Sequence, residues 1–151
     1  MSGPRAAVAA AWLGAAAIVL QPACKFPQPP KPVVTAEADV YSGRVNPFWS
    51  VSGRDSVTLR QMVTALQPGS AAPEPPGLGY RGIVVHNAGQ LLARCYDLRV
   101  YRGAVAAQCE TGARTLADPG RQVERFLAET GLKRADPAAY DLAQQDFAAA
   151  P

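Results

Sequence analysis

The sequence predicts an α+β fold, in which helices pack on one face of a small, mainly antiparallel sheet of about four strands. Short apolar runs bounded by glycine, proline and asparagine predict the strands. Segments with apolar residues at helical spacing predict one helix within the series of strands and two helices after it. The resulting order is strand, helix, three strands and two helices, which is typical of helices covering a hairpin-rich sheet.

The first strand is predicted at Val33–Tyr41, where apolar residues occupy alternate positions. The segment Ser42–Trp49 then joins this strand to the first helix. Turn formers occupy this joint, and the proline of Asn46-Pro47 disfavours the helical conformation in the residue before it. We expect Phe48 and Trp49 to fold back onto the core.

The first helix is predicted within Ser52–Gln67, because apolar residues at positions i, i+3, i+4 and i+7 form one face. These residues are Leu59, Met62, Val63 and Leu66. Asp55 or Ser56 is the expected N-terminal cap, and Pro68-Gly69 ends the helix. The proline-rich segment Ser70–Gly77 is expected to be a mobile loop.

Three further strands are predicted in the middle of the chain. Ile83–His86 is a short apolar run typical of a buried strand. Leu91–Tyr101 and Ala104–Cys109 are two strands of a hairpin. Thr111–Ala117 is expected to be a loop.

The hairpin has two possible registers. A three-residue loop, Tyr101–Gly103, places Cys95 opposite Cys109, whereas the two-residue loop Arg102-Gly103 places these cysteines on opposite faces. The apolar pattern favours the second register, and an oxidising compartment favours a disulfide. We expect the disulfide, which would stabilise a loop of about 15 residues by about 3 kcal/mol.

Two helices are predicted at the end of the chain. Asp118-Pro119 begins the first, which Gly131 ends, and Asp136-Pro137 begins the second. Tyr140 and Phe147 lie seven positions apart, on one face of the last helix. The folded domain is therefore expected to span residues 33–148, followed by a frayed tail at 149–151.

The N-terminus predicts export. Residues 1–23 read as a signal peptide, because one positive charge at Arg5 precedes the uncharged, almost wholly apolar run Ala6–Leu20. This run is shorter than the ~20 apolar residues that span a bilayer. Residues 24–32 contain four prolines and are suited to an extended tether. The protein is therefore expected to be secreted or anchored in the cell envelope.

Cys24 is a candidate lipidation site. A cysteine after an apolar run and a small residue resembles a bacterial lipoprotein signal, in which Ala23 and Cys24 match and Gln21 and Pro22 do not. A lipid anchor at Cys24 and plain secretion with cleavage nearby remain as alternatives. The anchor is the only membrane contact that the sequence suggests.

The charge balance argues against a nucleic-acid partner. The formal net charge is +3 and becomes +2 if Arg5 is removed with the leader. No basic cluster accompanies it, so a weakly basic surface is the simpler interpretation. We expect a monomer that binds a protein or a surface ligand.

The sequence offers little catalytic chemistry. His86 is the only histidine, at the end of a predicted strand, so a catalytic triad would have to use it. Gly77–Gly82 has the form G-x-G-x-x-G, but it precedes a strand, whereas a dinucleotide-binding loop follows one. Cys95 and Cys109 lack the further ligands of a zinc site. We therefore predict no catalytic residue, no metal and no cofactor.

Arginine and aromatic residues gather in two glycine-containing segments, and these residue types are enriched at binding hot spots. We predict that they form a binding surface. The residues are Arg44, Asn46, Trp49, Tyr80 and Arg81. A purely structural role in turns and core is the competing interpretation.

The two segments also carry a resemblance. Tyr41-Ser42-Gly43-Arg44, followed by Asn46-Pro47 and Trp49, and later Gly79-Tyr80-Arg81-Gly82, resemble a group of small exported proteins of unknown function. The resemblance implies that the two segments belong to one design. It implies no activity, substrate or catalytic residue.

Three functional hypotheses follow. The leading one is a non-catalytic, exported or lipid-anchored binding or accessory module. The second is a small extracellular inhibitor of an enzyme such as a protease, which would present the loop Ser70–Pro76 or the hairpin tip at Arg102. The third is a hydrolase that uses His86.

Overall fold

The computed structural model describes residues 33–149. The predicted signal peptide at 1–23, the candidate lipidation site Cys24 and the predicted tether at 24–32 lie outside the described residues. No helix within 33–149 is long and apolar enough to cross a membrane.

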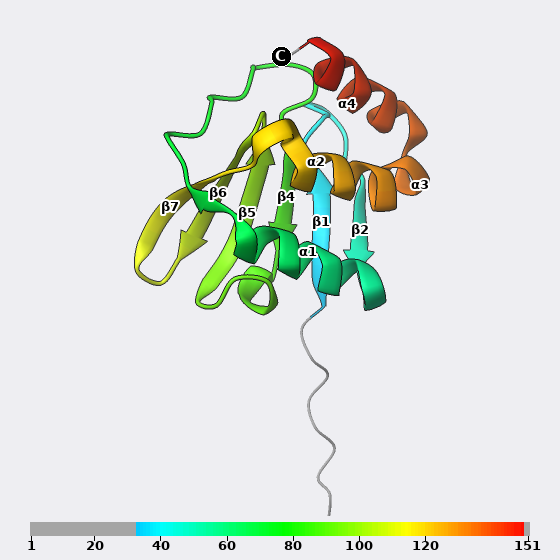
Figure 1. The fold of residues 1–151 in the computed structure, drawn as a ribbon. Coiled ribbons are helices and arrows are strands. Elements are labelled where there is room, and N and C mark those ends of the chain that lie inside the picture. The colour runs from blue at the N-terminus through cyan, green and yellow to red at the C-terminus, as the bar shows by residue number, and fades with distance from the viewer. Residues whose placement is uncertain (1–32, 150–151) are drawn as a thin grey trace, which may run out of the picture. The chain divides into compact units, whose positions relative to one another are not determined.

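Seven strands form one sheet in the order β2-β1-β4-β5-β6-β7-β3, and each neighbouring pair is antiparallel (Figure 1). The strands are β1 (Val34–Ala38), β2 (Phe48–Val51), β3 (Gln67–Pro68), β4 (Ile83–His86), β5 (Cys95–Tyr101), β6 (Ala104–Cys109) and β7 (Gly112–Ala117). The α+β class is confirmed. The prediction of about four strands is wrong, because β2, β3 and β7 were not expected.

The helices are α1 (Gly53–Ala65), α2 (Gln122–Leu127), α3 (Lys133–Ala135) and α4 (Pro137–Ala149). The short turn η2 (Pro119–Arg121) precedes α2, and the π-helical turn η3 (Ala128–Leu132) joins α2 to α3. A further short helical turn, η1 (Ala88–Gln90), connects β4 to β5. In Figure 1, α1 and α2 cross the same face of the sheet, and α4 lies beyond its upper end.

The core lies between the sheet and these helices. Along β1, Val34, Ala36 and Ala38 are buried and the residues between them are partly exposed. Leu59 of α1 and Leu127 of α2 are fully buried on this side. No helix of residues 33–149 covers the opposite side of β1, β4 and β5, which we call the uncovered face (Figure 1).

The predicted joint between strand and helix contains a strand of its own. The side-chain Oδ1 of Asn46 accepts hydrogen bonds from the backbone N–H groups of Val40 (3.1 Å) and Tyr41 (2.9 Å), which fixes a reversal of the chain. The chain then returns as β2, antiparallel to β1. Trp49 folds back as predicted, but Phe48 lies on the uncovered face and is 68% exposed.

The first predicted helix is present, with different ends. It begins at Gly53 after Ser52, so neither Asp55 nor Ser56 is its N-terminal cap. The helix stops at Ala65, and the chain continues through Gln67–Pro68 as the edge strand β3.

The segment predicted as the loop Thr111–Ala117 is the strand β7. Its register against β6 continues from Cys109 opposite Gly112 to Ala104 opposite Ala117. Leu116 is the residue of this strand that is buried, so the sequence has too few apolar positions to show a two-residue period. Pairing with a stable neighbour makes it a strand.

Gly131 does not end the helix that begins after Asp118. The helical chain continues through η3 and α3 to Ala135. A Cβ atom at Gly131 would lie 1.8 Å from Nε1 of Trp49, so the glycine makes room for the indole. The next predicted helix start is confirmed, because Oδ1 of Asp136 accepts a hydrogen bond from the N–H of Ala139 at 3.0 Å.

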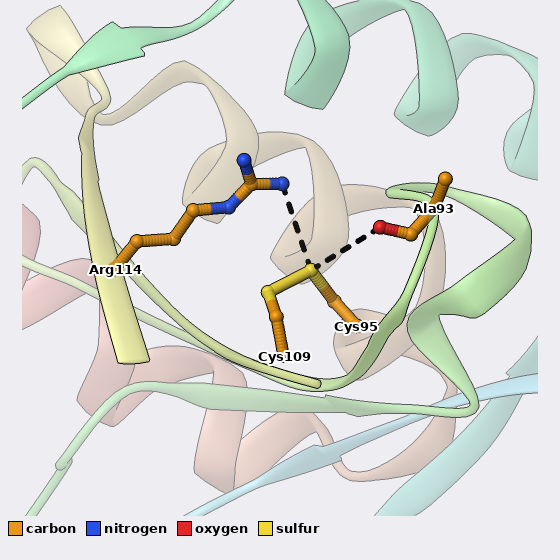
Figure 2. The surroundings of a disulfide bond; sticks show 4 residues. All are labelled: Ala93, Cys95, Cys109 and Arg114. Atoms are coloured by element: carbon orange, nitrogen blue, oxygen red, sulfur yellow. Dashed lines mark hydrogen bonds between the residues drawn. A yellow bond between two sulfur atoms is a disulfide. The ribbon is translucent and has the colours of Figure 1, made fainter. Parts of the chain in front are cut away.

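The hairpin satisfies both of the competing sequence signals. Arg102-Gly103 is a two-residue turn, since Tyr101 lies opposite Ala104. The register shifts between Cys95 and Asp97, so Cys95 nevertheless lies opposite Cys109 and the two form the predicted disulfide (Figure 2). A β-bulge, one extra residue on β5, accounts for this shift.

Candidate functional site

The uncovered face carries a first group of charged side chains around Asp39, which we call the arginine cluster. Arg81 donates from Nε (2.9 Å) and Nη2 (2.5 Å) to Asp39 Oδ1, and Arg99 donates from Nη1 to Asp39 Oδ2 at 3.0 Å. Burial opposes ionisation of Asp39, but the bonds from both arginines outweigh it and lower the pKa of this carboxyl. The cluster therefore holds three charged side chains in a fixed arrangement.

A second group, which we call the histidine cluster, consists of Glu37, His86 and Asp97. The imidazole Nδ1 lies 3.2 Å from Asp97 Oδ1, and Nε2 lies 3.4 Å from Glu37 Oε2. Asn46 joins the cluster by donating from Nδ2 to Glu37 Oε1 at 2.9 Å. The strand order β1-β4-β5 brings these residues together, because Glu37 lies on β1, His86 on β4 and Asp97 on β5.

The geometry of His86 is poorly suited to general-base catalysis. A general base needs a ring nitrogen that accepts a proton from a hydroxyl or water. Here both ring nitrogens face carboxylate oxygens, which are acceptors when ionised. Within residues 33–149, no group of three or more histidine, cysteine or acidic residues is arranged to hold a metal ion.

The five residues predicted as a binding surface separate in the structure. Asn46 and Arg81 lie at the uncovered face, in contact with the two clusters. Trp49 packs against Gly131 beneath the helices. Closeness in the sequence does not place these five side chains on one surface, because adjacent residues of an extended chain point to opposite sides.

Tyr80 illustrates this alternation, since it lies beside Arg81 in sequence and points into the protein. Its side chain is buried, its hydroxyl donates to Glu124 Oε1 at 2.8 Å, and its ring packs edge-on against Phe147. Burial raises the pKa of Tyr80 well above its ordinary value, and the nearby charge of Glu124 raises it further.

Arg44 lies at the junction of α3 and α4. Its guanidinium stacks over the ring of Tyr41 with 3.5 Å to the centroid, and Nη2 lies 3.7 Å from Asp136 Oδ2. The same carboxylate oxygen accepts a hydrogen bond from the Tyr41 hydroxyl at 2.9 Å. These contacts attach the β1–β2 connection to the start of α4.

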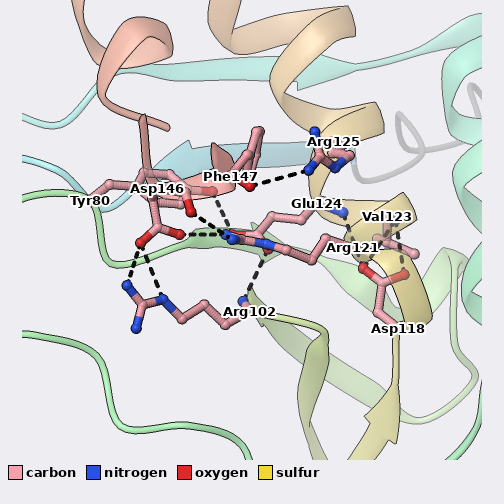
Figure 3. Close-up of polar contacts among 9 residues, drawn as sticks. All are labelled: Tyr80, Arg102, Asp118, Arg121, Val123, Glu124, Arg125, Asp146 and Phe147. Carbon is pink, nitrogen blue, oxygen red and sulfur yellow. Dashed lines mark hydrogen bonds and ion pairs between the residues drawn. The ribbon is translucent and has the colours of Figure 1, made fainter. Parts of the chain in front are cut away.

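Glu124 is the centre of a buried ionic network that sequence reasoning missed (Figure 3). Arg121 donates to Glu124 from Nε (2.9 Å) and Nη2 (3.1 Å), and to Asp146 Oδ2 from Nη2 (2.6 Å). Arg102 donates to the other oxygen of Asp146 from Nε and Nη2. Burial raises the pKa of Glu124 against the opposing effect of Arg121.

This network connects the hairpin tip, α2 and α4, and its members bond each other. Glu124 is fully buried, and its two oxygens also accept from the Tyr80 hydroxyl and the Arg102 backbone N–H. We therefore assign the network a structural role. No sequence signal identified it, because its members come from four separate segments.

Two of the surface hollows among the described residues lie beside the elements discussed above. One, of about 490 Å³, lies between the end of α1 and the start of α2 and is mainly apolar, with Met62, Leu66 and Val123 among its lining residues. The other, of about 440 Å³, adjoins the histidine cluster and is lined by His86, Tyr96 and Asp97 together with residues of η1. His86 and Asp97 belong both to this second hollow and to the uncovered face.

Residues 33–149 thus define a class of protein: a seven-stranded antiparallel sheet with helices on one side and ordered charged clusters on the other. Comparisons with known protein families, with curated proteins and with solved structures gave no significant match to this chain.

Proposed function

We propose that the protein is a non-catalytic, exported or envelope-anchored binding module whose ligand docks on the uncovered face. The observation that carries this proposal is the exposure of Phe48. It is 68% exposed on β2, at the edge of the sheet, and stands directly opposite Glu37 of the histidine cluster. Aromatic residues, phenylalanine among them, and arginine are enriched at protein interfaces relative to the rest of the surface.

The difference between the two faces of the sheet supports the proposal. The helices and their core stabilise one side of the sheet, and packing there explains its apolar residues. The clusters on the other side are fixed by hydrogen bonds while Arg99 keeps 40% of its side-chain surface exposed. Groups held rigid before a ligand arrives lose less entropy on binding.

An inhibitory role is less well supported by the geometry. The guanidinium of Arg102 at the hairpin tip is paired with Asp146, so a protease would have to break this pair before using the arginine. The loop Ser70–Pro76 is largely exposed and keeps that hypothesis open. The hydrolase hypothesis is weakened by the carboxylates on both sides of His86.

Paired variants test the docking surface. Phe48→Ser and Arg99→Ser change the uncovered face, whereas Val57→Ser and Arg60→Ser change matched exposed residues of α1. Each protein is cross-linked to native envelope and extracellular fractions, and the captured partners are compared by mass spectrometry. We expect the first pair to lose partners that the second pair retains.

Identical partner lists for all four variants would remove the uncovered face as the docking surface. Circular dichroism and urea unfolding establish that each variant is folded before comparison. The export part of the proposal has its own test, the intact mass of the native protein. We expect a chain that begins at or near Cys24, and a chain that retains Met1–Leu20 would contradict removal of a signal peptide.

A further inference from the structure

The bulge on β5 has a consequence for the uncovered face. Cys95 and Leu98 are both buried, although three residues apart, which a strand with a two-residue period does not allow. The extra residue resolves this, because it turns both Tyr96 and Asp97 away from the core. Tyr96 is 57% exposed and the Asp97 side chain is 49% exposed. Bulges often re-aim side chains beside functional sites.

The disulfide holds this arrangement in place. Cys95 precedes the two outward residues and is bonded to Cys109 across the hairpin (Figure 2). Arg114 approaches the disulfide, with Nη2 at 3.6 Å from the sulfur of Cys95. Arg114 lies opposite Ala107, and Ala107 lies opposite the buried Leu98. Residues directly opposite each other share a face of the sheet, so the guanidinium of Arg114 lies on the helix side.

Asp97 is the acidic residue among those that line the resulting hollow. A second carboxylate, that of Glu37, lies 3.4 Å from the other ring nitrogen of His86, so two acidic side chains flank the imidazole at this end of the face. The cation nearest along β5 on this face, Arg99, is already paired with Asp39 at 3.0 Å.

We infer that this hollow binds an organic cation, a primary ammonium or a guanidinium group. The inference rests on the proposed function and names the chemistry of its ligand. Asp97 would accept hydrogen bonds from the cation, and the exposed ring of Tyr96 would stack on it by a cation–π contact. The volume of about 440 Å³ suits an organic group of side-chain size or larger.

Isotope-labelled native protein tests the inference by nuclear magnetic resonance. The probes are spermidine, the blocked tripeptide acetyl-Gly-Arg-Gly-amide and its neutral counterpart acetyl-Gly-Gln-Gly-amide. We expect the cationic probes to shift the amide resonances of Asn87, Tyr96 and Asp97 and the neutral peptide to leave them unchanged. A response to spermidine alone identifies a free polyamine as the source, and a response to the arginine peptide alone identifies a protein side chain.

Two near-isosteric variants supply the contrast. Asp97→Asn removes the carboxylate of the hollow, and Asp141→Asn removes an exposed carboxylate of α4. We expect Asp97→Asn to raise the Kd of the cationic probes by about tenfold or more, because hydrogen bonds to charged groups contribute about 1.5–3 kcal/mol. Asp141→Asn should leave the Kd unchanged. Tyr96→Ser, at an exposed position, provides a second weakening variant if Asp97→Asn does not fold.

Equal Kd values for the two aspartate variants, equal shifts with the neutral peptide, or no response to either cation would overturn the inference. This failure is distinct from failure of the proposed function. If Phe48→Ser still loses its partners, the uncovered face remains a docking surface with another ligand chemistry. If cations bind but no uncovered-face variant loses a partner, the hollow is a small-molecule site and the docking proposal fails.

Discussion

At the scale of single residues, Gly131 was predicted to end a helix, but the glycine is needed for a tertiary contact with Trp49. A glycine near the end of an apolar repeat predicts a helix end. Gly131 has no left-handed backbone conformation and lies inside a continuous helical segment. Its small size is needed because the indole of Trp49, from a strand far away in sequence, occupies the place of a side chain.

Gly131→Ala is expected to lower the free energy of unfolding by about 1–3 kcal/mol, as overpacking does. The sign is informative, because alanine in a helix is otherwise more favourable than glycine by about 1 kcal/mol. Urea unfolding measures the change. The same Gly131→Ala change should cost less when Trp49 is already replaced by leucine. The comparison is between the double variant and Trp49→Leu alone. A more stable single variant would show that the indole moves aside freely.

Two tyrosines allow a second residue-scale prediction. The Tyr80 hydroxyl donates to the fully buried Glu124, whereas the Tyr140 hydroxyl donates to the exposed Glu129. Tyr80→Phe should lower the free energy of unfolding by about 1.5–3 kcal/mol, because a buried carboxylate loses a partner. Tyr140→Phe should leave stability nearly unchanged, since water replaces its hydroxyl. Chemical denaturation of both variants decides this, and equal effects would argue against burial as the cause.

At the scale of elements, the β5–β6 hairpin combines two pairing requirements that a regular strand ladder without a bulge could not both satisfy. Apolar pairing requires the register in which Val100 faces Val105, and the disulfide requires Cys95 to face Cys109. One extra residue on β5 satisfies both, and it also brings Tyr96 to the surface. The bulge therefore links the stability of this element to its candidate binding hollow.

Removal of this disulfide in the double variant Cys95→Ala, Cys109→Ala is expected to lower the free energy of unfolding by about 2–4 kcal/mol. The reason is that the reduced, unfolded chain gains conformational freedom. The amide resonances of Tyr96 and Asp97 should also broaden or shift, because the bulge is no longer pinned. Reduction of the native protein by a phosphine serves as an independent comparison, and unchanged unfolding midpoints in both cases would contradict a stabilising role.

At the scale of the whole described domain, carboxylates joined to arginines connect separate parts of the chain. Asp39 binds Arg81 and Arg99, and Asp146 binds Arg102 and Arg121. For each aspartate, burial opposes ionisation, but the bonds from the arginines outweigh it, so the pKa is lowered.

These lowered pKa values give stability a defined pH dependence. A carboxyl whose pKa is lower in the folded state than in the unfolded chain stabilises the fold above the unfolded pKa, about 3.9 for aspartate. That stabilisation is lost as the pH falls from about 4 through the folded pKa. Glu124 acts in the opposite sense, because burial raises its pKa in the folded state. Its effect is a loss of stability as the pH rises from about 4.3, the unfolded pKa of glutamate, through its folded pKa, above the range in which the aspartates act.

Asp146→Asn tests this pH dependence, and Asp141→Asn on the same helix is its control. Asp146→Asn should lower stability at about pH 6 and show a smaller further loss between about pH 4 and pH 2 than the native protein. Urea midpoints across this range measure both effects. Parallel pH profiles for native protein and Asp146→Asn would mean that other groups cause the acid sensitivity.

Several elements were predictable from the sequence because their reasons are local. The amphipathic repeat of α1 and the apolar run of β4 are present where expected. Asp136-Pro137 begins a helix as predicted, since the aspartate carboxylate caps the chain within the next turn. Interactions between residues a few positions apart determine these features.

The candidate site was only partly predictable. Arg81 and Asn46 stand out in the sequence because arginine and asparagine occur there in glycine-containing turns, and the structure places both at the uncovered face. Phe48 and Tyr96 were not found, because their exposure depends on a chain reversal and on a bulge. Tyr80 was included for its residue type, although its partner is Glu124 in the interior.

The sequence by itself determined the α+β class, the disulfide between Cys95 and Cys109 and the helices that begin after proline signals. The tertiary structure alone decided that β2, β3 and β7 are strands, that Gly131 lies within a helix and which side chains face outward. The physical reason is that propensity and periodicity act over a few residues. Strand pairing and side-chain exposure instead depend on neighbours that the fold brings from distant parts of the chain.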